Sequence, residues 1–403
     1  MFGRRARARR VLIVVQNLPL PLDRRVWLEC GALTAAGIGV SVVCPKGDGS
    51  MASSFQYLDG VRIHRYDPPP VASGALGYVR EFLVCWLRTA VLVWREYRAV
   101  GFQVLQTCNP PDTYWALSLL LRPFGVRFVY DQHDLCPEVY LSRFGDQASS
   151  RLHRMLVWLE RATYRSADRV ISTNESYRQV AITRGHVDPE RITIVRSGPD
   201  PDRLRPVPAE ADLRRGRTHL CCYLGVMGPQ DRVDLIVEAV DHLVHRMGRT
   251  DTQFALLGFG DCFDELQAMV KARGLADFID FTGRADDDMI RRYLSTADLG
   301  LAPDPKSPLN DVSTHNKVME YMACATPVIS FDLVETRVSA GAAAEYVTPD
   351  EDPVAFAHAI DELLDDPERR AEMGRLGRER VERDLAWKHQ APNYVSVFTP
   401  LFD

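Results

Sequence analysis

The sequence predicts an α/β fold with two doubly wound, Rossmann-like domains, and three observations lead to this prediction. Short apolar segments typical of buried strands alternate with amphipathic segments typical of helices. The alternation stops in a segment rich in proline and charge and then restarts. The chain of 403 residues is also longer than one ordinary domain. We therefore expect a domain at 1–200, a linker at 201–218, a domain at 219–380 and a closing segment at 381–403.

The first domain opens with the strand-like run RVLIVVQ at 10–16, followed by an amphipathic helix within 23–37. Val26 and Leu33 lie on the apolar face of that helix, and Gly37 stands just past its end, as a C-terminal cap would. Further strands are expected at 40–45, 101–107, 127–133 and 168–174, with helices at 113–121 and 147–166 between them.

The most apolar helical stretch is EFLVCWLRTAVLVW at 81–94. It is shorter than the ~20 residues that a bilayer requires, and Arg88 interrupts it. We predict a buried or interfacial helix here. Contact of 75–97 with a membrane surface is the alternative.

The second domain repeats the same alternation. Strands are expected at 220–225, 253–258, 278–283, 298–303 and 327–330, and helices at 232–247, 261–273, 286–295, 314–324, 353–364 and 367–384. Ligands of doubly wound sheets bind at the carboxyl ends of the strands. The segments that follow these strands are therefore the candidate binding loops.

Composition narrows the function classes. The net charge of −5 argues against a protein that binds nucleic acid through a global positive field. Nine cysteines without a C-x-x-C pair argue against a disulfide framework or a structural zinc site, and they favour a reducing cytoplasm. The apolar run near the start is too short for the core of a signal peptide.

The segment STHNKVME at 313–320 predicts an anion site at the start of a helix. Ser313 or Thr314 can act as N-cap, and the free N–H groups of a first turn hold phosphates. The helix dipole disfavours Lys317 there unless an anion joins it, which suggests a diphosphate. Glu320, nearly on the same face, suits the hydroxyls of a ribose. The alternative is a capped helix with a solvated Lys–Glu pair.

Two other strand ends of the second domain contain candidate binding residues. Gly258 and Gly260 stand between a strand and a helix, as in a nucleotide loop, although the glycines could serve only a tight turn. Gly283 and Arg284 precede a helix that Asp286 can cap. Arg284 could pair with a phosphate or with its acidic neighbours.

The first domain offers two further candidates. His133, flanked by aspartates in VYDQHD, suits an active site at a strand end, although a structural histidine is the alternative. Asp23 is expected to be an N-cap after the loop QNLPLPL. Arg24 and Arg25 follow it and could bind an anion or stay solvated. The sequence has no P-loop, no G-x-S-x-G and no G-x-G-x-x-G after the first strand.

Long stretches of the chain resemble family-4 glycosyltransferases of the GT-B fold. FTGR, MIRRYLSTADLGLAPDP and NKVMEYMACATPVIS resemble the donor-binding half of that family. VLIVVQNLPLPLDRRVWLECGALTAAGIGVSVVCPKG and YDQHDLCPEVY resemble its acceptor half, as found in bacterial surface-polysaccharide clusters. The segment 381–403 matches the family's final helix, which crosses back to the first domain. The resemblance implies two Rossmann-like domains that face each other across a cleft.

The resemblance also implies roles for individual residues. His133, Lys317 and Glu320 are the expected catalytic residues: His133 lies near the transferred sugar, Lys317 near the diphosphate and Glu320 at the ribose. The resemblance implies donor binding at Asn17, Asp23, Gly283, Arg284, Ala285 and Asn316. We also expect donor binding at Arg24, Gly225, Gly258, Gly260, Ser313, Thr314 and His315.

The sequence departs from the family pattern at the phosphate loop. Two cations that the family usually has become Val226 and Asp231, and Arg232 stands where glycine is usual. Lys317, aided by Arg284, His315 or the Arg24–Arg25 pair, must then supply the positive charge. We expect Lys317→Ala to lower turnover far more than stability. Ala325 replaces the common glycine after the helix, which costs about 1 kcal/mol if its backbone is left-handed.

The expected function is that of a retaining bacterial hexosyltransferase or N-acetylhexosaminyltransferase. It would move a sugar from a nucleotide-diphosphate donor, for which we expect a UDP-sugar, to a polysaccharide, lipid-linked or secondary-metabolite acceptor, without a metal or other cofactor. We expect it in the cytoplasm or at the inner face of the membrane, with weak peripheral membrane contact and no nucleic-acid partner. Two alternatives stay open: a nucleotide-sugar-binding GT-B protein with impaired catalysis, and a GT-B sugar epimerase.

Overall fold

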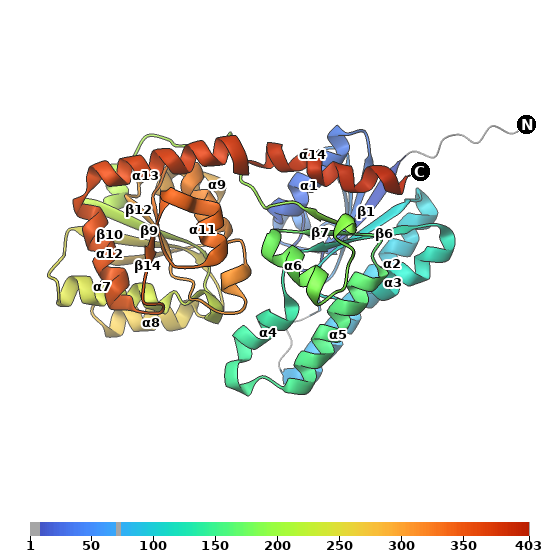
Figure 1. The fold of residues 1–403 in the computed structure, drawn as a ribbon, viewed down its shortest axis with the longest axis horizontal. Coiled ribbons are helices and arrows are strands. Elements are labelled where there is room, and N and C mark those ends of the chain that lie inside the picture. Colours follow the sequence, from blue (N-terminus) through green and yellow to red (C-terminus); the bar gives the residue numbers. More distant parts are fainter. Residues whose placement is uncertain (1–8, 70–73, 403) are drawn as a thin grey trace, which may run out of the picture. The chain divides into compact units, whose positions relative to one another are not determined.

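A computed structural model describes residues 9–69 and 74–402 of the chain (Figure 1). Positions 1–8, which open the predicted first domain, together with 70–73 and 403, lie outside the described residues. The chain divides into two compact units. Unit 1 comprises Met1–Leu141, Asp146–Arg196 and Gln390–Asp403, and unit 2 comprises Ser142–Gly145 and Ser197–His389.

Unit 1 is built on an eight-stranded sheet of order β3-β4-β2-β1-β5-β6-β7-β8. The strands run parallel except β3, which pairs antiparallel with β4. The elements are β1 Arg10–Val14, α1 Arg24–Ala35, β2 Gly39–Pro45, β3 Phe55–Leu58, β4 Val61–Tyr66, α2 Gly74–Ala99, β5 Val104–Cys108, α3 Trp115–Leu121, η2 Arg122–Phe124, β6 Arg127–Gln132, α4 Cys136–Phe144, α5 Ser150–Ser166, β7 Arg169–Ser172, α6 Glu175–Thr183, β8 Ile192–Ile194 and α14 Trp387–Phe398.

Unit 2 is built on a six-stranded, all-parallel sheet of order β11-β10-β9-β12-β13-β14. Its elements are β9 His219–Val226, η6 Pro229–Asp231, α7 Asp234–His245, β10 Thr252–Phe259, α8 Phe263–Ala272, β11 Ile279–Gly283, α9 Asp287–Thr296, β12 Leu299–Ala302, η7 Asn310–Val312, α10 Asn316–Ala323, β13 Val328–Phe331, α11 Val334–Ala340, β14 Ala344–Val347, α12 Pro353–Asp365 and α13 Pro367–Arg380. The predicted α/β class with two doubly wound sheets is therefore confirmed.

The core of unit 2 has two layers, one on each face of the sheet. Cys221 and Tyr223 of β9 pack with α7, α8 and α12, whereas Leu220 and Leu224 pack with α9, α10 and α11. Alternate residues of the strand thus enter opposite layers, as the strand period of two requires. Figure 1 shows these two groups of helices on the two sides of the sheet.

Several elements were not predicted from the sequence. The hairpin β3–β4 turns at Asp59 and Gly60, whose φ angles are 47° and 84°. The dipeptide Asp-Gly is the strongest local signal for such a turn, so this hairpin could have been predicted. Strands β8 and β14 and helices α4, α6 and α11 are short, and their sequences show too few periods to be recognised.

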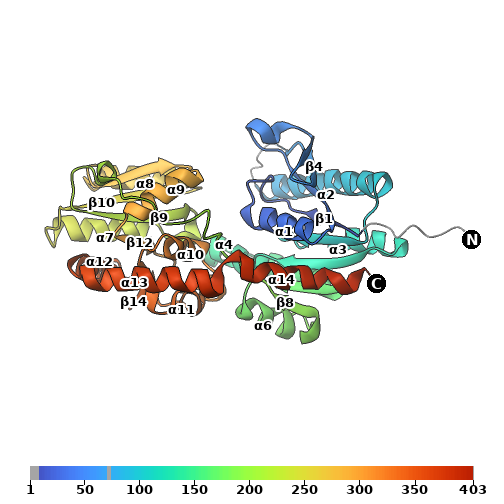
Figure 2. The ribbon, with the colours of Figure 1, turned by 90° about the horizontal axis from the view of Figure 1, so that it is seen from above.

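Helix α2 is longer than the predicted stretch and spans 26 residues (Figure 2). It buries Cys85 and Val93 in unit 1 and exposes Leu83 and Leu87 on the opposite side. Within 9–69 and 74–402, no helix is both long and apolar enough to cross a bilayer.

The residues around the predicted linker belong to unit 2 from Ser197 onward. The backbone N–H of Glu210 donates to Thr296 Oγ1 over 3.0 Å, and Arg214 pairs with Asp298 at 2.7 Å. These bonds attach the segment to α9 and to the start of β12.

The position of Ala325 gives a test of backbone strain. Its φ of 60° is left-handed, so glycine is expected to raise stability there by about 1 kcal/mol, or about 2–4 °C in the melting temperature of a domain of this size. The matched control is Ala323→Gly two residues earlier. Ala323 is buried in α10, and glycine in a helix costs about 1 kcal/mol, so this variant should melt lower. Thermal denaturation of both variants checks the prediction, and a lower melting temperature for Ala325→Gly would contradict it.

Candidate functional site

The carboxyl ends of β9 and β10 approach each other through two glycines. Gly225 and Gly258 are partners in the register of these strands. A Cβ atom on Gly258 would lie 1.8 Å from the carbonyl oxygen of Gly225, so no other residue fits. A Cβ atom on Gly260 would lie 2.5 Å from the carbonyl oxygen of Met227. The predicted glycines thus allow close backbone packing at the edge where ligands of such sheets bind.

Lys317 lies beside this glycine pair and is buried. A Cβ atom on Gly225 would be 3.4 Å from Lys317 Cε. The ammonium donates to both carboxylate oxygens of Asp304, over 2.7 Å and 2.9 Å, and lies 5.0 Å from the centre of the Tyr223 ring. Although burial opposes the charge, Asp304 and Asp231 raise the pKa of Lys317 above its usual value. The lysine is therefore a buried, charged partner of Asp304, and a solvated Lys–Glu pair is excluded.

Asp231 lies on the other side of Lys317. One of its oxygens lies 3.7 Å from Lys317 Nζ, and the other accepts the N–H of Gly228 over 3.0 Å. Burial raises its pKa to about 6, Lys317 opposes this change and Asp304 adds to it. One lysine thus faces two carboxyl groups, and the more exposed of these keeps its proton to a higher pH than an ordinary aspartate.

Two neighbouring departures from the family pattern are seen in the same loop. The side chain of Val226 is 55% exposed at the end of β9. Arg232 has a φ of 46°, the left-handed backbone that the usual glycine would adopt, and pairs with Asp234 at 3.0 Å. The loop therefore keeps the backbone conformation of the pattern while its charges differ.

The start of α10 differs from the prediction. Neither Ser313 nor Thr314 is the N-cap: His315 has that position, and its side chain makes no capping hydrogen bond. Ser313 precedes the helix by three residues because η7 ends at Val312, and its hydroxyl donates to the carbonyl oxygen of Leu309 over 2.7 Å. Thr314 is half-buried, and Asn316, the first helical residue, is exposed.

The imidazole of His315 also contributes to this cluster. Its Nε2 lies 3.6 Å from Asp304 Oδ1, and burial lowers its pKa. Glu320 is half-buried one turn after Asn316. The start of α10 thus brings Lys317, His315 and Asp304 together at the same edge as Gly225.

The loop after β11 has the features expected of a backbone-lined site. Gly283 has a φ of 69°, and Ala285 is half-buried. The guanidinium of Arg284 stacks over the ring of Phe259, 4.1 Å from its centre. Asp286 caps α9, as predicted, by accepting the N–H of Met289 over 2.9 Å.

His133 of unit 1 belongs to a buried polar cluster at the end of β6. Its Nε2 lies 2.9 Å from Asp131 Oδ2 and 3.1 Å from Arg25 Nε. The backbone N–H of His133 donates to Asn109 Oδ1 over 2.7 Å. Asp131 Oδ2 and the N–H of Arg25 Nε thus both contact His133 Nε2, and Asn109 holds the backbone of the same residue.

Arg25 is the cation at the centre of this cluster, so the alternative of a solvated arginine is wrong. Its guanidinium donates to Asp131 Oδ1 over 3.1 Å and to the carbonyl oxygen of Val195 over 3.0 Å. Glu29 lies 3.0 Å from Arg25 Nε. Burial opposes ionisation of Asp131, but Arg25 and His133 lower its pKa below the usual value. Burial and Asp131 raise the pKa of Glu29 well above normal, so Glu29 holds a proton.

Gln106 and Tyr394 complete the cluster. Gln106 Nε2 donates to Glu29 Oε2 over 2.9 Å and to Asp131 Oδ2 over 3.0 Å. The hydroxyl of Tyr394, on α14, donates to Gln106 Oε1 over 2.6 Å. The side chains therefore fix His133 through residues from α1, β5, β6 and α14.

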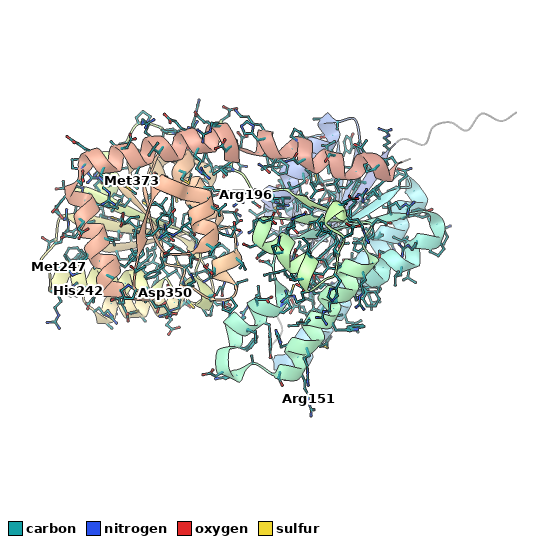
Figure 3. All side chains as sticks on the ribbon, viewed as in Figure 1. Arg151, Arg196, His242, Met247, Asp350 and Met373 are labelled. Carbon is teal, nitrogen blue, oxygen red and sulfur yellow. The ribbon has the colours of Figure 1, made fainter. Side chains whose placement is uncertain are left out.

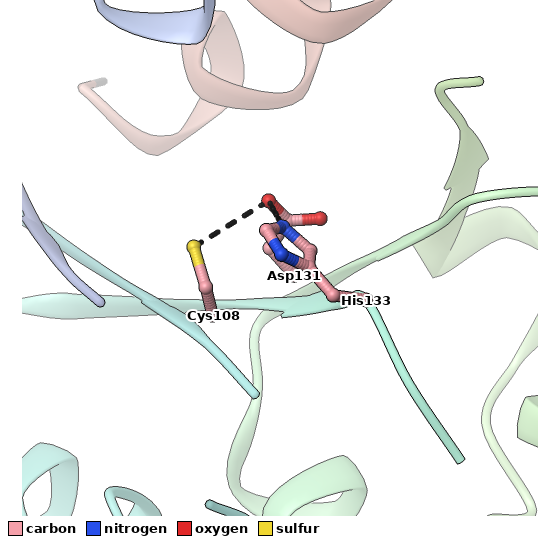
Figure 4. A group of neighbouring side chains, drawn as sticks. All are labelled: Cys108, Asp131 and His133. Atoms are coloured by element: carbon pink, nitrogen blue, oxygen red, sulfur yellow. Dashed lines mark hydrogen bonds and ion pairs between the residues drawn. The ribbon is translucent and has the colours of Figure 1, made fainter. Parts of the chain in front are cut away.

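Cys108, Asp131 and His133 are the one group of metal-ligand types within the described residues (Figure 4). Their ligand atoms lie within 4.8 Å of one another, with Cys108 Sγ 3.7 Å from Asp131 Oδ2. Arg25 binds Asp131 and also contacts His133. A fixed positive charge at two of the three ligands opposes a second cation there. Burial, Asp131 and Glu29 raise the pKa of the Cys108 thiol well above normal. The protonated thiol is a weak metal ligand.

The first loop of unit 1 contains the remaining predicted residues. Asp23 caps α1 as predicted, since its Oδ1 accepts the N–H of Val26 over 3.1 Å. Asn17 is exposed between β1 and α1, and Arg24 is half-buried in the first turn. Their predicted role in donor binding stays a prediction.

Sequence reasoning missed Glu29, Gln106, Tyr394 and Asp304 as site residues, and it named Arg25 only as an anion-binding candidate, without its contact to His133. A signal existed for two of them: Gln106 interrupts an apolar strand, and Glu29 falls on the apolar stripe of α1 four residues after Arg25. Asp304 could have been noted as an acid directly after a buried strand.

Two family models match most of the chain. The model described as "Glycosyl transferase 4-like domain" matches residues 22–198, and the model described as "Glycosyl transferases group 1" matches residues 218–366. The alpha-D-kanosaminyltransferase of Streptomyces kanamyceticus is 25% identical over 332 residues, which cover 78% of this chain and 82% of that protein.

Solved structures share the fold along the whole chain. Sucrose-phosphate synthase of Thermosynechococcus elongatus has a TM-score of 0.78 and 19% identity, covering 98% of this chain and 99% of its own. Anabaena HepE in complex with UDP-glucose has a TM-score of 0.70 and 14% identity, covering 97% of this chain and 99% of its own.

The cluster in unit 1 predicts that two amide substitutions change the stability of the fold by different amounts. Glu29→Gln keeps the size and neutrality of a protonated carboxyl group, so we expect its stability within about 1 kcal/mol of the wild type near pH 5. Asp131→Asn leaves Arg25 without its charged partner, and breaking a buried ion pair costs about 3–5 kcal/mol. Thermal and denaturant unfolding of the two variants measure this difference.

The pH dependence of the same pair gives the sign of the Glu29 effect. A raised carboxyl pKa stabilises the fold fully below the usual value of about 4.3, and this contribution is lost as the pH rises toward the folded-state pKa. Glu29→Gln lacks this loss, so its stability relative to wild type should rise as the pH increases above about 4.3. If the stability of Glu29→Gln relative to the wild type falls as the pH rises, the proton is not on Glu29.

The ion pair in unit 2 revises the expectation for Lys317. Removal of the ammonium by Lys317→Met leaves Asp304 buried and unpaired, so the variant should lose about 3–5 kcal/mol of stability. The double variant Lys317→Met with Asp304→Asn removes both charges and should recover most of that loss. Denaturant unfolding measures the stability of both variants. Equal losses of stability in the single and double variants would contradict the proposed charge pairing.

Proposed function

Because this chain belongs to the family-4 glycosyltransferases and has the GT-B fold, it is a glycosyltransferase, and we propose that it is a retaining enzyme with a UDP-sugar donor. The bond between the anomeric carbon and the diphosphate breaks, and the acceptor oxygen bonds to the same face of the sugar. The proton of the acceptor hydroxyl passes to a diphosphate oxygen. UDP and the glycosylated acceptor leave.

The start of α10 beside Gly225 is the observation that supports this proposal most directly. No capping side chain of His315 occupies the first turn, and Lys317 lies at the glycine-lined strand ends. Backbone amides at a helix start bind a diphosphate and stabilise the charge that develops on it as it leaves. These amides take over part of the role of the two missing family cations.

The charge of Lys317 reaches a donor only in part, because Asp304 neutralises it. A second candidate function follows from this observation: a GT-B protein that binds a nucleotide sugar weakly or without turnover. Asp231 strengthens that alternative, since it places a further carboxyl group near the same ammonium.

His133 is proposed to act at the transferred sugar. Its Nε2 contacts both Asp131 and Arg25, so Nδ1 is the ring nitrogen that is left to meet a sugar hydroxyl. Its ring is 16% exposed, which leaves one edge accessible. The cluster of Arg25, Asp131 and Asn109 orients this ring and takes no part in bond breaking.

The donor and acceptor are proposed by analogy with the relatives. HepE was solved with UDP-glucose, and the Streptomyces relative is named for transfer of an amino sugar. We propose a UDP-hexose or UDP-aminohexose donor, and a polysaccharide, lipid-linked or secondary-metabolite acceptor. We propose that transfer requires no metal, since Arg25 opposes a cation at the His133 cluster and Lys317 with the α10 amides serves the diphosphate.

The experiment that tests the function is a screen of nucleotide sugars by thermal shift, because a ligand that binds the native state raises the melting point. Donors that bind are then incubated with simple sugar and lipid-linked acceptors, and the anomeric configuration of the product is read by NMR. A product with the configuration of the donor is expected. Inversion would overturn the retaining mechanism, and binding without transfer or slow hydrolysis would favour the binding protein.

Glu320 gives a test of the ribose contact that does not need an acceptor. Loss of a charge-assisted hydrogen bond costs about 1.5–3 kcal/mol, so Glu320→Gln should bind UDP at least about tenfold more weakly. The same variant should bind 2′,3′-dideoxy-UDP as well as the wild type does. Glu265→Gln, an exposed glutamate on α8, is the matched control and should change neither affinity. An equal loss for both nucleotides would remove Glu320 from the ribose site.

A further inference from the structure

Unit 1 exposes large apolar side chains on four helical elements, α2, α3, η2 and α5. Leu83, Leu87, Val91 and Trp94 of α2 recur at the spacing of one helix face, with Leu83 56% and Leu87 51% exposed. Leu120, Phe124, Met155 and Trp158 extend the set over α3, η2 and α5. These eight apolar residues, together with the arginines around them, are called the basic apolar face below.

The basic apolar face is continuous between its elements. The ring of Trp94 meets Phe124 with 5.5 Å between the ring centres. Trp158 meets Trp115 of α3 at 5.9 Å, and α3 packs on α5.

Arginines surround this face, and few acids accompany them. Asp168, before β7, lies 3.9 Å from Arg122 and 3.3 Å from Arg127. The exposed arginines of α2, η2, the start of β6 and α5 are Arg80, Arg88, Arg95, Arg98, Arg122, Arg127, Arg151, Arg154, Arg161 and Arg165. Figure 3 shows Arg151 pointing outward at the start of α5. Of the acids on these helices, Glu96 and Glu160 are buried against Arg62 and Arg184, and Glu81 is half-buried.

We propose that the basic apolar face docks unit 1 on a membrane surface that contains anionic lipids. Leu, Phe and Trp side chains enter the boundary between headgroups and acyl chains, and exposed Trp residues favour that boundary. The arginines pair with lipid phosphates above them, each adding to the attraction near an anionic surface. The proposal does not depend on the identity of the donor.

The charge pattern distinguishes this occupant from two others. A second copy of the chain on a two-fold axis would set arginines against arginines, because the same face meets itself. Nucleic acid would meet the apolar stripe of α2 between the arginines, and the chain as a whole has a net charge of −5. A membrane surface satisfies both the apolar and the basic side chains.

Docking on a surface differs from spanning it. No described helix is long and apolar enough to cross a bilayer, so α2 would lie in the plane of the interface. An enzyme held in this way meets acceptors that are themselves embedded in the membrane.

The test is sedimentation of the full chain with two kinds of vesicle, phosphatidylcholine alone and phosphatidylcholine with phosphatidylglycerol. We expect binding to the anionic vesicles at low salt, and weaker binding as the salt concentration rises. Leu87→Asp should abolish binding, and Arg95→Glu with Arg98→Glu should weaken it at least about tenfold. Donor hydrolysis and thermal stability should stay unchanged in these variants.

Matched controls lie on unit 2. Val338→Asp changes an exposed valine of α11, and Arg246→Glu reverses an exposed arginine after α7; both should leave vesicle binding unchanged. Absence of binding to anionic vesicles at low salt would overturn the proposal. Equal loss in face and control variants would also overturn it, as would a dimer, or binding to RNA, that Leu87→Asp disrupts while vesicle binding persists.

Discussion

The buried guanidinium of Arg25 holds the carboxyl edge of unit 1 together. It bonds to Asp131 at the end of β6, to Glu29 one turn further along α1 and to the carbonyl group of Val195 after β8. A buried cation is tolerated only when its hydrogen bonds are made. The positions of α1, β6 and the segment after β8 are therefore set by one side chain. His133 gains its orientation from that arrangement, so the reactivity of the site depends on a group that need not touch a sugar.

Unit 2 uses the same physical device, in which one buried cation faces two carboxyl groups. In unit 1 one arginine serves a carboxylate and a protonated glutamic acid, and in unit 2 one lysine serves Asp304 and Asp231. The excess carboxyl group of each cluster has a raised pKa, because burial and a like neighbour both disfavour its charge. Glu29 thus neutralises its cluster by holding a proton, whereas Asp231, with a pKa of about 6, takes up a proton only as the pH falls toward that value.

The sequence predicted the α/β class, the two sheets and most strand positions, because buried parallel strands read as short apolar runs. It also located Asp23 and Asp286 as helix caps, since a cap depends on a few adjacent residues. It failed at the start of α10, where the turn η7 delays the helix and shifts the cap to His315. It could not pair Lys317 with Asp304 or Tyr394 with Gln106, because these contacts join residues 13 and 288 positions apart. A local sequence pattern indicates on which face of a helix or strand a residue lies, but not which distant residue its side chain contacts.

The last residues of the chain belong to the unit that contains the first ones. Tyr394 donates to Gln106 inside unit 1, while the whole of unit 2 lies between them in sequence. A ribosome releases the chain from its N-terminus, so unit 2 can fold as a complete piece before α14 emerges. Until α14 is synthesised, unit 1 stays incompletely folded, because Tyr394 does not yet bond to Gln106. Its final assembly follows the synthesis of unit 2, and any chaperone demand should fall on this older half of the polypeptide.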